Sequence, residues 1–284
     1  MSALLQYVIS GLALGCTFAL VGSGFVVIHR VTRVVNFAQG AFPVIAGLAT
    51  ASLLTRGLPH GAAELVAILL GGVIGLVVGV VAIGKPGTPP LASLVITLGL
   101  AIFAYAVEII VWGDQPVSFP GLSGTVNVAG ARIQQQYFLV IVVALVTFAL
   151  LELFFGRTYL GKGLAACASN PYSARLVGIS VTRMGLVAFA LGGVLGGLAG
   201  VLVTPLQAVS FDSDVTLAIN GFAAAIFGGL MRPMMALVGG LVLGVAEALV
   251  AGYYESAFQT EVALAIMLTL MVWQASRRSA LEEA

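Results

Sequence analysis

The stretch Ala168-Ser-Asn-Pro-Tyr-Ser-Ala-Arg-Leu-Val-Gly-Ile-Ser180 has the pattern of a short helix that faces water. Asn170 is a favourable N-cap, and Pro171 suits the first helical position, where its missing amide hydrogen costs nothing. Gly178 is a natural helix stop. The pattern predicts a helix of about two turns, which is too short to be stable unless it packs against another element.

The chain around this stretch is strongly apolar. Its 284 residues are 60% hydrophobic and only 8% charged, with a mean hydropathy of +1.13. A soluble domain needs far more charge to cover its surface. The sequence therefore predicts an all-α polytopic membrane protein with about eight to ten transmembrane helices. The net charge of +1 gives no indication of nucleic-acid binding, and the two cysteines form neither a disulfide framework nor a metal-binding pattern.

Apolar segments that can cross roughly 30 Å of hydrocarbon recur along the chain. The first lacks a basic n-region and a clear cleavage site, so we expect a retained span. Segment 215–231 is short and glycine-rich, and fits either a crossing or a half-helix. Counting it as a crossing gives the favoured number of nine. The other expected spans are 4–28, 34–54, 62–84, 91–112, 136–155, 184–204, 234–252 and 259–275.

The basic residues predict how the chain is oriented. With nine crossings and the N-terminus outside, ten Lys and Arg residues lie inside, and only Arg56 and Arg132 lie outside. The C-terminus and the polar loop 156–183 are then cytoplasmic. The outer segments 113–135, expected to contain a small hairpin, and 204–214 are where an outer partner would dock.

Two rows of glycine recur every four residues. Gly71, Gly75 and Gly79 form one row, and Gly192, Gly196 and Gly200 form the other. Such rows allow close helix–helix packing, which is their most common role in membranes. Because the rows lie in separate halves of the chain, they are also consistent with an internal repeat.

Four parts of the chain carry a family pattern. They are Gly11-Leu-Ala-Leu-Gly-Cys-Thr-Phe-Ala-Leu20 followed by Val34-Val-Asn-Phe-Ala-Gln-Gly40, the loop segment 161–180, Ala224-Ala-Ile-Phe-Gly-Gly-Leu230 and Gly240-Leu-Val-Leu-Gly-Val-Ala-Glu-Ala-Leu249. Together they resemble the permeases of ABC importers for branched-chain amino acids, over about residues 7 to 272. The loop segment resembles the cytoplasmic coupling loop of that family.

The resemblance implies a single permease domain over residues 1–284, with the coupling loop at 156–183. Its partners would be two ATP-binding subunits, a second permease subunit, usually in a heterodimer, and a periplasmic or lipoprotein solute-binding protein. The chain itself would lie in the cell inner membrane. The chain has no Gly-x-x-x-x-Gly-Lys-Ser/Thr loop, so it would depend on a partner for ATP. We expect no cofactor and no enzyme activity. The residues expected to dock an ATP-binding subunit are Lys162, Asn170, Pro171, Tyr172, Ala174, Arg175, Leu176 and Gly178. Apart from the resemblance, a connector lying on the membrane interface explains the loop equally well.

Polar residues inside apolar segments are candidates for a translocation path, because lipid does not satisfy buried polar groups. The candidates are Asn36, Gln39, Gly40, Asn220 and Glu247. Ordinary interhelical hydrogen bonds explain Asn36 and Gln39 equally well. Glu108 and Glu247 are the acids expected inside spans, and a structural role for Glu247 is favoured over a proton relay.

The chain departs from the family pattern at two places. Family members often have Glu after Gly40, where this chain has Ala41, and Met231-Arg-Pro-Met234 replaces a glycine-containing turn. The transported solute therefore stays open among amino acids, urea and short amides. The alternative function is an ion-coupled secondary transporter, for which Glu247 is the main support.

Overall fold

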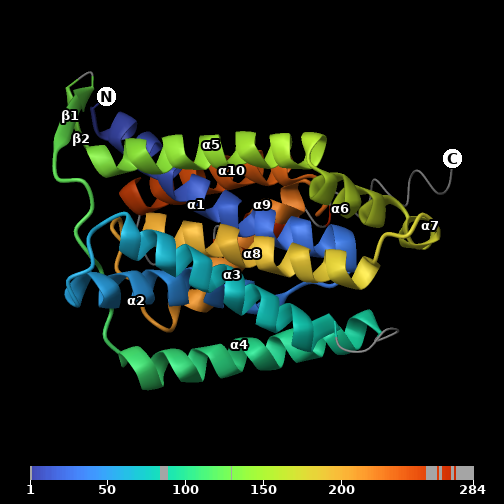
Figure 1. Cartoon of the computed structure of the whole chain (residues 1–284). Helices are drawn as coiled ribbons and strands as arrows, with labels where there is room; N and C mark the ends of the chain where they lie inside the picture. Colours follow the sequence, from blue (N-terminus) through green and yellow to red (C-terminus); the bar gives the residue numbers. More distant parts are fainter. Residues whose placement is uncertain are drawn as a thin grey trace, which may run out of the picture.

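The computed structural model describes residues 2–83, 89–128, 130–253, 261, 264–269 and 272. Long helices run side by side along one axis, with a small hairpin at one end and two short helices at the other (Figure 1). We call these the hairpin end and the α6–α7 end. The elements are α1 (Ser2–Thr32), η1 (Phe37–Gln39), α2 (Ala41–Thr55), α3 (Ala62–Ile83), α4 (Pro90–Trp112), β1 (Thr125–Val128), β2 (Ala131–Gln134), α5 (Gln135–Arg157), α6 (Tyr159–Ser169), α7 (Pro171–Leu176), α8 (Val181–Val203), α9 (Ser213–Phe227) and α10 (Pro233–Tyr253).

The prediction of an all-α polytopic membrane protein is confirmed. Seven helices within the described residues are long and apolar enough to cross a membrane. The predicted span 215–231 corresponds to α9, whose 15 residues are fewer than those of each of the seven candidate spans. The predicted span 259–275 lies largely outside the described residues.

Helix α1 lies at the centre of the bundle and contacts α5, α8, α9 and α10 (Figure 1). Its middle portion is almost completely buried, whereas α4 and α5 expose most of their apolar side chains. A helix that is hydrophobic all round is suited to a buried position. The exposed faces of α4 and α5 suit contact with lipid or with another membrane subunit.

Glycines form the closest helix contacts. A Cβ added to Gly71 on α3 would lie 2.7 Å from the carbonyl oxygen of Gly193 on α8. In the same way, a Cβ on Gly11 of α1 would lie 2.7 Å from the carbonyl oxygen of Gly244 on α10. Small residues at these positions let backbones meet, which is how helices associate in lipid.

The predicted glycine row on α8 has a different partner from the row on α3. Gly193 and Gly197 face α3, whereas the predicted row Gly192, Gly196 and Gly200 faces Ile28, Phe42 and Pro43. Helix α8 therefore has two glycine faces and lies between α3 on one side and α1 and α2 on the other.

The connection from α1 to α2 is broken, but upstream of the expected position. Residues 33–36 are not helical, and Asn36 caps η1 by accepting a hydrogen bond from the Ala38 amide at 3.2 Å. Gly40 packs against the backbone of Asp214, and Pro43 is accommodated in the first turn of α2. Proline at the start of a helix loses no hydrogen bond, so Pro43 does not interrupt α2.

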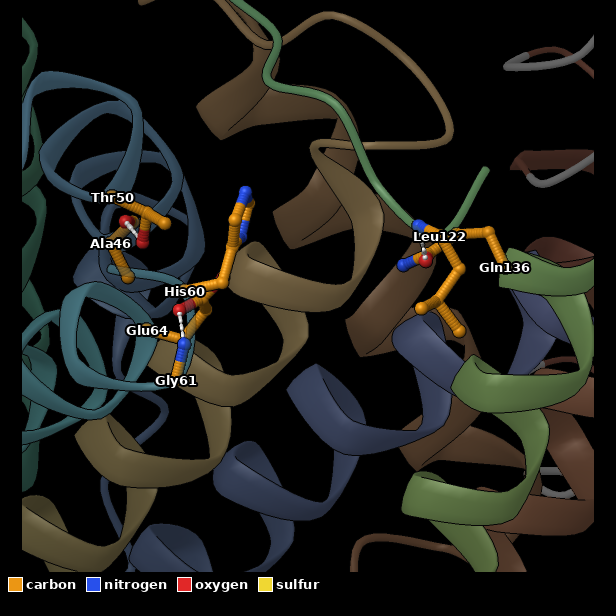
Figure 2. A network of polar contacts seen from close by, with 7 residues as sticks. All are labelled: Ala46, Thr50, His60, Gly61, Glu64, Leu122 and Gln136. Carbon is orange, nitrogen blue, oxygen red and sulfur yellow. Dashed lines mark hydrogen bonds and ion pairs between the residues drawn. The ribbon is translucent and has the colours of Figure 1, made fainter. Parts of the chain in front are cut away.

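The loops at the hairpin end are tied to one another. Strands β1 and β2 form the predicted hairpin, and Val117 and Val209 exchange two backbone hydrogen bonds of 2.9 Å between the two outer segments. Figure 2 shows two further contacts at helix starts: Glu64 accepts a hydrogen bond from the Gly61 amide, and Gln136 accepts one from the Leu122 amide at 3.0 Å. This end therefore presents loops that hold one another in place.

Candidate functional site: coupling surface and polar core

The loop between α5 and α8 consists of two helices, α6 and α7, and α7 is the short capped helix that the sequence predicts. The Asn170 side chain accepts hydrogen bonds from the amides of Tyr172 and Ser173, at 3.0 and 3.1 Å, and so caps α7. Gly178 follows α7 with φ of +84°, a conformation that glycine adopts without strain. A local cap and a local stop therefore define this six-residue helix.

Packing anchors the two helices to the body of the protein. Leu164 and Cys167 of α6 and Ala174 of α7 are buried against Val27 and Ala188, which belong to α1 and α8. The Arg33 guanidinium donates a hydrogen bond of 3.0 Å to the Ala168 carbonyl. The loop is thus fixed to the ends of α1 and α8.

The outward face of α7 and its C-cap carries large apolar side chains that are mostly exposed. Tyr172, Leu176 and Val177 are 70%, 72% and 74% exposed. Lys162 and Arg175 are exposed beside them. Exposed large apolar side chains that cluster on a rigid support are typical of protein-binding surfaces. Of the predicted docking residues, only Ala174 is buried, and it anchors α7 instead of facing outward.

Burial also affects the cysteine in this loop. It raises the pKa of the Cys167 thiol, and the nearby Arg175 offsets part of that effect. A buried thiol that stays protonated reacts slowly.

Asn36 and Gln39 are completely buried and bond within the protein. The Gln39 side chain donates a hydrogen bond of 3.0 Å to the Gly192 carbonyl on α8, and Asn36 donates one of 3.4 Å to Gln39. These bonds fix the break between α1 and α2 against α8. In this conformation Gln39 makes an interhelical bond to α8, whereas the two Asn36 bonds are local, to Gln39 and Ala38.

Asn220 and Glu247, predicted separately, lie together. The Asn220 amide donates a hydrogen bond of 3.4 Å to Glu247 across the contact between α9 and α10. The second carboxyl oxygen of Glu247 and the amide oxygen of Asn220 have no hydrogen-bond partner among the described residues. The pair links two helices and keeps unused hydrogen-bonding capacity.

A second buried acidic pair was missed in part by the sequence reading. Glu108 on α4 is completely buried, and Asp214 at the start of α9 is 7% exposed. The two carboxyl groups interact electrostatically, and both Glu108 oxygens and one Asp214 oxygen lack a hydrogen-bond partner in the described part of the chain. Asp214 follows a polar loop, so its sequence context indicates exposure. Tertiary packing buries it: Tyr105 of α4 contacts Phe211 of that loop, and Gly40 packs against the Asp214 backbone.

Asp214 lines a cavity of about 630 Å³ between α4, α9 and the start of α2. Gly40, one of the predicted path residues, lines the same cavity, whereas Asn36, Gln39, Asn220 and Glu247 do not. The other wall residues are almost all apolar. They include Phe25, Val35, Leu98, Ile102, Tyr105, Ala218, Ile219 and Phe222.

A bundle of apolar helices with glycine contacts and a polar core defines a multi-pass membrane protein. Sequence comparison gives the family. The model for the permease component of the branched-chain amino acid transport system matches residues 7–274. The chain belongs to this family and is a permease subunit of the ABC importer type.

Individual relatives are similar over most of their length. The high-affinity branched-chain amino acid transport system permease protein LivH of Salmonella typhimurium is 27% identical and covers 94% of this chain and 92% of its own. The corresponding protein BraD of Pseudomonas aeruginosa is 28% identical, and the match covers 95% of this chain and 94% of BraD. The ribose import permease protein RbsC of Haemophilus influenzae is 26% identical, covering 82% and 71%.

A solved structure shares the fold. The PsaBC complex from Streptococcus pneumoniae, determined with a Fab, matches with a TM-score of 0.55 and 13% sequence identity. The match covers 95% of this chain and 91% of the other. At this identity the similarity concerns the fold alone.

Proposed function

We propose that this chain forms the translocation path of an ATP-driven importer for branched-chain amino acids or related small polar solutes. The observation that carries the proposal is the outward apolar face of α7, held on a helix pair that is anchored to α1 and α8. An ATP-binding subunit docked on α7 would act on both membrane helices through α6. The substrate class follows from the printed names of the relatives.

The proposed assembly has two ATP-binding subunits at the α6–α7 end and a solute-binding protein at the hairpin end. The N-terminus is outside, the C-terminus is cytoplasmic, and the membrane is the inner membrane. With nine crossings, ten Lys and Arg residues lie on the cytoplasmic side and two lie outside, which supports this orientation. A second permease subunit would cover part of the exposed apolar surface of α4 and α5.

Docking can be tested by co-purification with the ATP-binding subunits encoded in the same transport system. The double variant Arg175→Glu with Leu176→Asp places two negative charges on the outward face of α7. Because Tyr172 and Leu176 belong to the same exposed surface, we expect the ATP-binding subunits to be lost while the permease stays folded.

A matched control carries the same changes at the opposite end. Val126→Asp with Arg132→Glu alters one exposed apolar and one exposed basic residue of the hairpin. The control should retain the ATP-binding subunits. A complex that survives the α7 variant intact would overturn the docking assignment.

A further inference from the structure

One residue that lines the cavity beside α4 and α9 is acidic, and the rest of the lining is almost entirely apolar. Asp214 is more than nine-tenths buried and lines this cavity, and one of its carboxyl oxygens has no partner among the described residues. Glu108 of α4 interacts with Asp214 and is fully buried, and neither of its oxygens has a geometrically defined hydrogen-bond partner among the described residues. Buried carboxyl groups of native proteins are normally satisfied, so this pair points to a missing partner.

The chemistry of the pair identifies the partner as a cation. Two carboxyl groups in contact at a site of low dielectric repel each other when both are ionised, and a positive charge beside them relieves that repulsion. No described Lys or Arg lines the cavity. Among the described residues nothing supplies this counter-charge, and a bound cationic group would supply it.

The rest of the cavity is suited to the side chain and the carboxylate of an aliphatic amino acid. Its volume of about 630 Å³ is in the range usual for small-molecule sites. Phe25, Ile102 and Phe222 provide apolar walls. Gly40 and Ala41, at the N-terminus of α2, line the same space, and a helix N-terminus attracts a carboxylate.

We propose that this cavity binds an aliphatic α-amino acid, with its ammonium group at the Asp214–Glu108 pair. The carboxylate lies toward the start of α2, and the side chain lies against the apolar walls. This inference rests on the proposed function and names the residues that recognise the solute within the membrane.

The test uses the reconstituted transporter with one cysteine introduced into the cavity. Uptake is measured in parallel with the wild-type transporter. Ala218 lies one turn after Asp214 on α9 and lines the cavity, so Ala218→Cys reports occupancy through its labelling by N-ethylmaleimide. The native cysteines, Cys16 and Cys167, are buried and give little background. The probes are L-leucine, 4-methylpentanoate, which lacks the ammonium group, and 3-methylbutylamine, which lacks the carboxylate.

We expect leucine to protect the cysteine best, the amine less well, and 4-methylpentanoate not at all. Adding Asp214→Asn should raise the leucine concentration for half-protection about tenfold or more, the usual effect of removing a charge-assisted hydrogen bond. Asp212→Asn is the matched control, because Asp212 is exposed two residues away and accepts a hydrogen bond from Ser210. The control should protect like the parent.

Other outcomes separate this inference from the proposed function. Equal protection by leucine and 4-methylpentanoate, protection by sodium ions alone, or no effect of Asp214→Asn would overturn the ammonium site. If the wild-type transporter still takes up leucine with ATP, the proposed function survives each of those results. A wild-type transporter that takes up no amino acid would remove the proposed function and this inference together.

Discussion

Gly71 lacks a side chain where the backbone of α8 comes closest to α3. The carbonyl oxygen of Gly193 and the Cα of Gly197 occupy the space that a Cβ would need. Neither atom belongs to a flexible side chain, so the helices themselves would have to separate. Close backbone approach is the main source of affinity between helices in lipid, and at this point it depends on one hydrogen atom in place of a methyl group.

We therefore expect Gly71→Ala to destabilise the protein by about 1 to 3 kcal/mol, the usual cost of overpacking. The measurement is thermal unfolding of the purified protein in detergent. Gly99→Ala is the matched control, because Gly99 is also within a helix but has no neighbour within 4 Å of its added Cβ. Equal melting temperatures for the two variants would show that the α3–α8 contact is looser than described.

At the scale of elements, α7 is held at one end by its cap and in the middle by one buried alanine. Asn170 binds two amides of the first turn, and Ala174 fixes the helix to α6 and α8. A helix of six residues has little stability of its own. Its order therefore depends strongly on the capping side chain.

Asn170→Ala should cost about 1 kcal/mol of local stability. Hydrogen exchange of the α7 amides should then accelerate roughly fivefold, because 1.4 kcal/mol corresponds to a factor of ten in population. The neighbouring Ser169→Ala serves as control, since no hydrogen bond to the Ser169 side chain supports α7. Unchanged exchange in the Asn170 variant would mean that packing alone orders the helix.

The sequence predicts the structure of α7 better than it predicts the surroundings of Asp214 or the faces of α8. The cap, length and stop of α7 are encoded within ten residues, so they can be predicted from local pattern. The burial of Asp214 depends on parts of the chain more than a hundred residues away, such as Gly40 and the helix of Glu108, and no local pattern reports it. Likewise, glycine spacing indicates close packing, but which face of α8 meets α3 is decided by the tertiary arrangement.

At the scale of the whole molecule, the two ends of the bundle differ in character. Basic residues are concentrated near the α6–α7 end, whereas the hairpin end has Arg56 and Arg132. The helices between them are apolar, and they separate the two ends of the bundle (Figure 1). A binding partner can reach one surface without passing the other.

Cysteine labelling checks this arrangement. Tyr159→Cys at the start of α6, where the side chain is 93% exposed, should react with a membrane-impermeant maleimide only after the cells are opened. Arg132→Cys on the hairpin should react in intact cells. The parent protein, whose two cysteines are buried, provides the background. Labelling of the Tyr159 variant in intact cells would reverse the proposed orientation.

The bond between Gln39 and the Gly192 carbonyl gives the bundle a mechanical property. Helix α8 is attached to α6 at its beginning, and halfway along its length it holds η1, which leads directly into the cavity wall at Gly40. If α8 moves as a rigid rod, a displacement imposed at α7 is transmitted along it and shifts the cavity wall at Gly40. One stiff helix and one side-chain amide would thus connect the docking surface at α7 to the cavity.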